Sequence, residues 1–221
     1  KLQSDTEADD IRILNHRFQG PTVSQFFLST TPVVSPQLIA QRIKGRLQHL
    51  LRPTILDAFQ RNYSLRSIGS TKRDKVEAYI ASQVEHYQLA DSRVDERFRQ
   101  YQISNDDVDL SSPRQTAHAV YWHNLHLVFV TRERDRHFSD ETLSVLHKMV
   151  CSAARKKGHR LSRAAILPDH VHIALGCDLS ESPQEVALSY LNNLAYAAGA
   201  PIFQFSYWMG TFGEYDRGAI R

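Results

Sequence analysis

An internal repeat constrains the fold of this chain more than any other feature of its sequence. The segment SPQLIA at residues 35–40 matches SPQEVA at 182–187, and FQRNYSLRSIG at 59–69 matches FQFSYWMGTFG at 203–213. The identities pair Phe59 with Phe203, Gln60 with Gln204, Tyr63 with Tyr207 and Gly69 with Gly213. Both matches occur in the same order and at similar offsets, 147 and 144 residues. Because self-similarity at one period indicates repeated structural units, we expect two copies of one small domain.

The second copy, expected at residues 116–221, has the more complete set of elements. A β-branched and aromatic run, YWHNLHLVFVTR, predicts a strand, and Ser139 then begins a helix that ends at a glycine. LSRAAILPDHVHIALG predicts a pair of strands, Ser182-Pro183 begins a second helix, and QFSYWMGTFG predicts a last strand. This order is typical of the α+β, ferredoxin-like split βαβ fold, an antiparallel sheet with helices on one face.

The first copy, expected at residues 1–102, is incomplete. RILNHRF and VSQFFLST correspond to the two middle strands, but no opening strand and helix precede them. After the shared elements the first copy continues into a predicted helix, RDKVEAYIASQVEHYQ at residues 73–88. The polar segment at 103–115, rich in Asp, Ser and Pro, predicts a linker between the copies. The fold expected overall is therefore a duplicated ferredoxin-like domain, arranged as a pseudo-dimer.

The composition is that of a soluble globular protein. Of the 221 residues 42% are hydrophobic and 23% are charged. No apolar run reaches the roughly 18 residues that a membrane span needs, and the first residues do not resemble a signal peptide. The two cysteines, Cys151 and Cys177, lack metal-ligand spacing and are expected to be packing residues. The net charge of +3 permits a polyanionic partner without requiring one.

The strongest local motif is Pro168-Asp169-His170-Val171-His172. Positions i and i+2 of a strand point to the same face, so both imidazoles can approach one metal ion. Imidazole binds several divalent metals, and a site with two histidines leaves positions open for substrate oxygens. The alternative is two histidines on a polar sheet face, but the flanking LPD and IALG make this less favoured.

Tyr79 is a second candidate, and it lies on the predicted helix of the first copy. Tyr79 and Gln83 are four residues apart and hence neighbours on one helix face. A tyrosine has an ordinary pKa near 10, so as a nucleophile it needs a base or a metal-polarised phosphate. Taken alone, such a helix is most simply a packing helix, and Tyr79 gains interest only beside the histidine pair.

A cationic cluster is the third candidate and belongs to the first copy. Its members are Arg42, Lys44, Arg46, Arg52, Arg61, Arg66, Lys72 and Arg73. Clusters of this kind neutralise phosphates and make nucleic-acid affinity salt-dependent, although a solvated helix face is an equal alternative. The equivalent helix of the second copy, EVALSYLNNLAYAAG, has no basic residue.

Together these segments resemble the IS200-like superfamily of transposases, the single-tyrosine HUH transposases of small bacterial insertion sequences and their repeat-associated relatives. The resemblance rests on LHLVFVTRERDRHF, LPDHVHIALG, SPQEV, QRIKGRLQHLL, FQRNYSLRSIGS and VEAYIASQ. It implies metal-dependent transposition and DNA recombination in the bacterial cytoplasm, acting on single-stranded DNA that contains hairpins. It also implies that Tyr79 attacks a DNA phosphate to give a 5′-phosphotyrosine, while His170, His172 and Gln83 bind Mg²⁺ or Mn²⁺.

The two copies differ from the family pattern in complementary ways. At the 147 offset His170 and His172 align with Val23 and Gln25, so the first copy lacks the histidines. At the 144 offset the counterpart of Tyr79 falls beyond Arg221. Because family members work as dimers that combine histidines of one subunit with the tyrosine helix of the other, we expect one composite site between the copies. A separation beyond roughly 10 Å between the Tyr79 hydroxyl and the histidine imidazoles, with no hinge able to close it, would exclude it.

Two other functions remain open from the sequence. A domesticated, non-catalytic nucleic-acid-binding protein would keep the fold and the basic helix while losing catalysis. A metal-binding or structural pseudo-dimer would have no nucleic-acid partner at all. The sequence does not identify the DNA hairpin, the metal or any further self-association.

Overall fold

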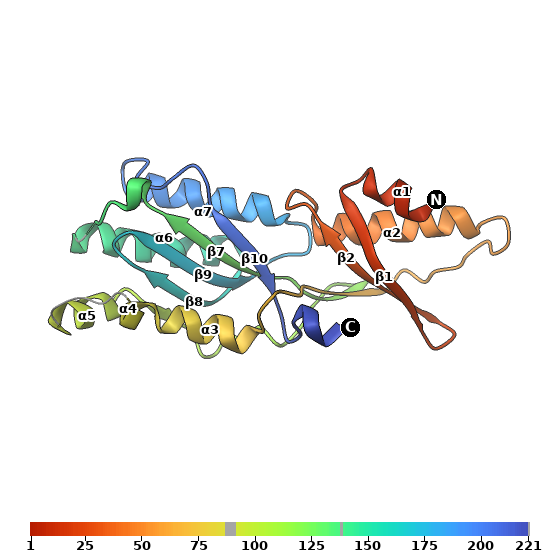
Figure 1. The fold of residues 1–221 in the computed structure, drawn as a ribbon, viewed down its shortest axis with the longest axis horizontal. Helices are drawn as coiled ribbons and strands as arrows, with labels where there is room; N and C mark the ends of the chain where they lie inside the picture. Colours follow the sequence, from red (N-terminus) through yellow and green to blue (C-terminus); the bar gives the residue numbers. More distant parts are fainter. Residues whose placement is uncertain (87–91, 138, 221) are drawn as a thin grey trace.

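The computed structural model describes residues 1–86, 92–137 and 139–220, which form an elongated α+β structure (Figure 1). One half contains a five-stranded sheet covered by helices, and the other contains the β1–β2 hairpin with α1 and α2. In the N-terminal part the elements are α1 (Leu2–Glu7), β1 (Ile11–Gln19), β2 (Val23–Thr30), α2 (Pro36–Leu51), β3 (Tyr63–Arg66), α3 (Arg73–Ala81), α4 (Gln83–His86) and α5 (Ser92–Arg99). None of the described helices could span a membrane.

The remaining elements build most of the larger sheet. They are β4 (Ile103–Ser104), β5 (Arg114–Gln115), β6 (Ala119–Trp122), β7 (Asn124–Val130), the short 3₁₀ helix η1 (Arg132–Arg134), α6 (Asp140–Lys157), β8 (Arg160–Ile166), β9 (His170–Gly176), α7 (Pro183–Ala197), β10 (Trp208–Phe212) and η2 (Arg217–Ile220). The strand order is β10-β7-β9-β8-β4, and all neighbours are antiparallel. This agrees with the split βαβ order predicted for the second copy.

Local sequence signals fix the ends of the two long helices. Ser139 caps α6, and Gly158 ends it with a left-handed φ of 66°. Ser182 and Glu185 form a capping box at the start of α7. One sheet face packs against these helices through fully buried side chains of β7 and β9 (Leu125, Leu127, Phe129, Val171, Ile173 and Leu175).

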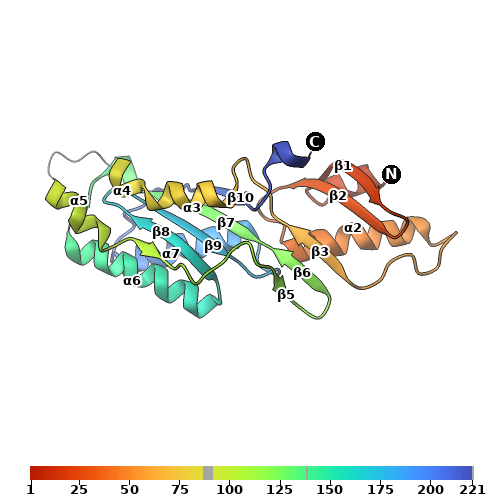
Figure 2. The ribbon, with the colours of Figure 1, turned by 90° about the horizontal axis from the view of Figure 1, so that it is seen from below.

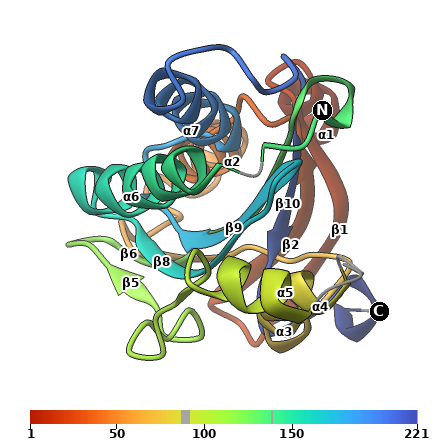
Figure 3. The same cartoon turned by 90° about the vertical axis from the view of Figure 1, so that its left-hand side faces the viewer.

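The opposite face of the sheet is covered by residues from the first half of the chain. Figure 3 shows α6 and α7 on one side of the sheet and α3 and α5 on the other. Val76 and Ile80 of α3 pack on the small side chains of Ala165 and Ala174 and on Phe212. Figure 2 shows α3 and α4 lying along this face. α3, which carries Tyr79, therefore rests on the sheet formed mainly by residues 119–220.

The predicted linker at 103–115 makes fixed contacts at both ends. β4 pairs with β8 at the edge of the sheet, and β5 pairs with β6 in a second sheet of order β3-β6-β5. Ile103 and Leu110 are buried. The boundaries of the two copies remain a prediction.

The N-terminal hairpin resembles the β8–β9 hairpin in several features. Val23 begins β2 as His170 begins β9, and Pro36 begins α2 as Pro183 begins α7. Each hairpin also contains a bulge at a matching place, between Ile13 and Asn15 in β1 and between Leu161 and Arg163 in β8. Ser35 caps α2 through Leu38 N. A small core around Ile11, Val34 and Ile43 joins β1, β2 and α2.

The two halves meet through contacts that occur in reciprocal pairs. Ser67 Oγ donates to the carbonyl of Phe212 at 2.7 Å, and Thr211 Oγ1, 144 positions later, donates to the carbonyl of Ile68 at 2.5 Å. A Cβ added to Gly69 would lie 2.2 Å from the carbonyl oxygen of Thr211, and one added to Gly213 would lie 2.4 Å from that of Ser67. Both glycines therefore allow the backbones to cross.

Main-chain hydrogen bonds between the two halves also occur in reciprocal pairs. Arg73 N donates to Gly213 O at 2.8 Å, and Arg217 N donates to Gly69 O at 3.1 Å. At the helix starts, Gln37 N donates to Leu179 O and Gln184 N donates to Pro32 O, both at 2.9 Å. Contacts in which i meets j and the counterpart of j meets that of i are typical of a two-fold interface.

Candidate active site

The histidine pair lies on the sheet face under α3. His170 and His172 begin β9, and their rings lie side by side with centroids 5.0 Å apart. Val171 between them is fully buried on the opposite face. The alternation expected of a strand therefore brings both imidazoles to one side.

Two neighbours orient these rings. His170 Nδ1 lies 2.6 Å from Asp169 Oδ1, and His172 Nδ1 lies 3.0 Å from Nε2 of His126, which comes from β7. When His170 Nδ1 donates to the carboxylate, its Nε2 presents a lone pair, as a metal-binding imidazole requires. The Asp169 carboxyl is also 3.5 Å from Arg134 Nη1.

Burial keeps two of the imidazoles neutral. Desolvation, followed by the charges of His126 and His170, lowers the pKa of His172 to about 3. Desolvation lowers the pKa of His126 to about 4. Near pH 7 both rings are therefore uncharged, and one donates the hydrogen bond that the other accepts.

Tyr79 lies beside this pair. Its ring centroid is 5.6 Å from that of His172 and 6.3 Å from that of His126. The side chain is 48% exposed, so an outside substrate can reach it. The Tyr79 ring is therefore a direct neighbour of two imidazoles.

Gln83 contacts both Tyr79 and the histidines. It is 5% exposed, its Nε2 donates to the Tyr79 carbonyl at 3.0 Å, and its Oε1 lies 3.5 Å from His170 Nε2. The single helix predicted for residues 73–88 is wrong in one respect. Ser82 leaves helical geometry, with φ −88° and ψ 2°. α3 therefore ends before it, and a separate short helix, α4, starts at Gln83. Tyr87 and Gln88 lie outside the described residues.

The donor set of His170, His172 and Gln83 fits a divalent metal. In the described part of the chain, no three His, Cys, Asp or Glu side chains are arranged to hold a metal ion, and the amide oxygen of Gln83 is the further donor beside the two histidines. Two neutral nitrogens and one oxygen suit Mn²⁺ and similar ions and leave positions open for substrate. The buried amide oxygen facing His170 Nε2 is the observation that favours this set.

The predicted cationic cluster is largely occupied by contacts within the protein. Arg42 and Arg46 lie 3.7 Å and 2.9 Å from Oδ2 of Asp9. Lys44 donates to the carbonyls of Gln60 and Arg61. These side chains hold α1 and the loop before β3 onto α2, so DNA could use them only in part.

Of the other members of the cluster, some have partners within the protein and some have no ion pair. Arg73 pairs with Glu77 and Glu214, and its hydrogen bond to Glu214 raises its pKa. Arg66 stacks on Trp122 at 3.6 Å, with the Tyr215 ring 5.8 Å away. Within the described residues no ion pair involves the exposed Arg52, Arg61 or Lys72. The DNA-binding role of all eight residues remains a prediction.

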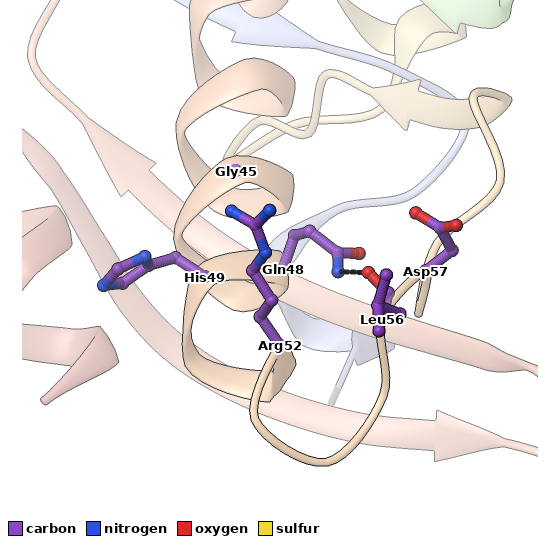
Figure 4. Close-up of a pocket in the computed structure, with 6 residues that line it drawn as sticks. All are labelled: Gly45, Gln48, His49, Arg52, Leu56 and Asp57. Atoms are coloured by element: carbon purple, nitrogen blue, oxygen red, sulfur yellow. Dashed lines mark hydrogen bonds between the residues drawn. The ribbon is translucent and has the colours of Figure 1, made fainter.

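A surface pocket of about 290 Å³ is shown in Figure 4, and neither His170 nor His172 lines it. It is lined by Gly45, Gln48, His49, Arg52, Leu56 and Asp57, at the end of α2 and in the following loop. Gln48 Nε2 donates to the carbonyl of Leu56 across it at 2.7 Å. The pocket holds no group placed for the chemistry of Tyr79.

Three further residues border the site, and the sequence analysis assigned no role to any of them. Asp169 and His126 contact the histidine pair, and Trp208 lies with its ring centroid 5.0 Å from that of His126. Alternation along β7 could have placed His126 on the polar face. No sequence signal could have placed Trp208 beside it, because that contact depends on the register of β10 with β7.

Comparison with known proteins identifies one part of the chain. The family model described as "Transposase IS200 like" matches residues 119–220. Eight chains of solved structures also match. One is the crystal structure of a candidate transposase from Deinococcus radiodurans, with 20% identity, a TM-score of 0.41, and coverage of 48% of this chain and 91% of that chain. No curated protein matches. Residues 119–220 are therefore similar to an IS200-like transposase domain.

Proposed function

We propose that this protein is a metal-dependent transposase, which cleaves and rejoins single-stranded DNA through a 5′-phosphotyrosine intermediate. The observation that carries the proposal is the 5.6 Å separation between the ring centroids of Tyr79 and His172. These residues lie on either side of the 103–115 segment, yet α3 brings the tyrosine over the histidine strand. The match of residues 119–220 to transposases supports the same class of reaction.

The site is composite because the chain is a duplicated pseudo-dimer. The reciprocal contacts around Gly69 and Gly213 support this arrangement, as do the matched bulges of β1 and β8. The histidines come from the second copy and the tyrosine from the first. The first copy has Val23 and Gln25 at the positions of the histidines and contributes no second metal pair.

The reaction needs an in-line attack and a leaving group. Tyr79 Oη attacks the phosphorus, and the bond from phosphorus to the 3′ oxygen breaks. The 5′ phosphate then stays on Tyr79, while the leaving oxygen takes up the proton that the phenol loses and becomes a 3′-OH. Attack by another 3′-OH reverses these steps and rejoins the strand.

The other residues prepare this step. His170, His172 and Gln83 would hold Mg²⁺ or Mn²⁺, which supplies polarisation of the phosphate and stabilises charge on its oxygens. Asp169 and His126 fix the orientation of the histidine rings. The hydrogen bond from Gln83 to the Tyr79 carbonyl ties the ligand to the nucleophile. Exposed Arg52, Arg61 and Lys72 are available to bind the DNA backbone.

The test is incubation of a labelled pool of single-stranded hairpins with Mn²⁺, followed by a denaturing gel. We expect a protein–DNA adduct that disappears in Tyr79→Phe and His170→Ala and on chelation of the metal. Tyr196→Phe, on the exposed side of α7, is the matched control and should keep the adduct. An adduct that survives in Tyr79→Phe would overturn the assignment of the nucleophile.

A non-catalytic nucleic-acid-binding protein is the second candidate. The observation that favours it is the loss of one histidine pair, at Val23 and Gln25. This function predicts salt-sensitive oligonucleotide binding without any adduct in the same assay. Absence of both adduct and binding would favour a structural role.

A further inference from the structure

Trp208 is a large aromatic side chain held in an exposed position beside the candidate site. It begins β10, the edge strand of the sheet, and is 55% exposed. Phe212, four residues along the same strand, is buried against Val76 and Ile80 of α3. Because alternate residues of a strand share a face, Trp208 lies on the sheet face that carries His126, His172 and Tyr79.

The indole packs against two neighbours. It lies over Gly210, where an added Cβ would meet its Cη2 at 2.9 Å and its Cζ2 at 3.3 Å. It also meets the His126 ring edge-on, with an interplanar angle of 71°. A glycine two residues on and an imidazole from β7 therefore both contact the ring.

More than half of the Trp208 surface is open to solvent and can be reached by a ligand. α3 packs on β8 and β9, while Trp208 and His126 lie on β10 and β7. Two half-exposed aromatic rings thus border the histidines, Tyr79 next to His172 and Trp208 next to His126. At the matched position of the first copy, which lacks the histidines, the residue is Ser64. The aromatic ring occurs in the copy that has the metal ligands.

We propose that Trp208 stacks on a nucleobase and so positions the nucleotide next to the phosphate that Tyr79 attacks. A rigid, exposed indole is suited to this role because every base has a π-face and the ring loses little freedom on binding. The ligand is an unpaired base, because a base inside a duplex has both faces covered. This inference rests on the proposed function in placing the phosphate, and Trp208 is a positioning residue.

The test is a scan for coupling between Trp208 and single bases. Oligonucleotides with one abasic unit at each position in turn are titrated against Tyr79→Phe protein, with and without Trp208→Ala. We expect Trp208→Ala to raise the Kd of the intact strand about tenfold, in line with stacking on one base. At one position of the strand, the abasic unit should raise the Kd of the protein that retains Trp208 by the same factor. With that abasic strand, Trp208→Ala should then raise the Kd no further.

Controls separate stacking from support of His126. Trp208→Phe should keep most of the affinity, and Tyr196→Ala, an exposed aromatic on α7, should change nothing. An equal loss with every abasic strand would mean that Trp208 only supports the fold, and an unchanged Kd would also overturn the proposal. The titration measures binding and does not depend on cleavage. If the unaltered protein formed no adduct but the coupling were observed, the proposed function would be contradicted while the stacking role of Trp208 would stand.

Discussion

At the scale of single residues, the histidine pair depends on a third imidazole from another strand. His126 is 7% exposed and its Nε2 is 3.0 Å from Nδ1 of His172. Because this contact engages Nδ1, Nε2 is the nitrogen of His172 that remains for another partner. Groups that orient a metal-binding histidine commonly change metal affinity by 10–100-fold when removed.

We therefore predict that His126→Phe weakens Mn²⁺ binding by about 10-fold or more, because the ring volume stays while the hydrogen bond is lost. His126→Gln, whose amide can replace the lost partner, should recover part of the affinity. Calorimetric titration with Mn²⁺ measures both, and His118→Ala, at an exposed histidine, is the control. An affinity of His126→Phe within twofold of the unaltered protein would show that His172 needs no such partner.

Sequence patterns found the residues of the site that are local in the chain. The HxH spacing placed His170 and His172 on one face, and the resemblance to transposases singled out Tyr79 and Gln83. The neighbouring residues His126 and Trp208 were not predicted, because their contacts depend on how the strands are paired. His126 meets His172 only because β7 pairs with β9, and Trp208 meets His126 only because β10 pairs with β7.

At the scale of elements, the tight crossing of the two repeated segments holds the halves together. The chain after β3 passes close to the chain after β10. A carbonyl oxygen of each segment lies where a Cβ would otherwise stand on the glycine of the other segment. The hydrogen bonds of Ser67 and Thr211 close the crossing from both sides. This crossing also sets the start of α3, since Arg73 N bonds to Gly213 O.

Gly69→Ala and Gly213→Ala should each destabilise the protein by about 2–3 kcal/mol, because the added methyl group would overlap a carbonyl oxygen. Gly45→Ala in the middle of α2 is the control. Its Cβ would meet nothing within 4 Å, and alanine should stabilise that helix by up to about 1 kcal/mol. Chemical denaturation compares the three. A loss below about 0.5 kcal/mol at Gly69 would show that the crossing relaxes at little cost.

The sequence predicted most elements but not their partners. Serine caps and glycine stops located α6 and α7, and period-two patterns located β8 and β9. The break at Ser82 was not predicted, because VEAYIASQ reads as one uninterrupted amphipathic helix. The pairing of β4 with β8 was not predicted either, since a polar segment of two paired residues has no pattern of its own.

At the scale of the whole molecule, charge and chemistry are divided between the halves. Residues 11–73 contain ten Lys or Arg and a single acidic residue, Asp57. Residues 119–220 contain ten basic and ten acidic residues and carry the histidines. The net charge of +3 conceals this contrast. We expect the N-terminal half to attract the DNA backbone and to deliver Tyr79, while the C-terminal half supplies the metal ligands.

This division leads to a prediction about how many chains form one site. If α3 packs on the sheet of its own chain, as in the structure, Tyr79 and the histidines that serve it belong to one polypeptide. Mixing Tyr79→Phe with His170→Ala should then restore no adduct, because every chain carries a defective site. If two chains exchanged α3 instead, mixed dimers would contain one intact site each, and about a quarter of the sites would recover.

The experiment requires that chains can exchange, so the two variants should be refolded together as well as mixed after folding. Refolding the unaltered protein with a chain that carries both substitutions is the control for loss of activity on handling. Recovery of the adduct only after joint refolding would show that the composite site can form between chains. No recovery in either case is what the reciprocal contacts within one chain predict, since they already satisfy the two-fold interface that a separate partner would occupy.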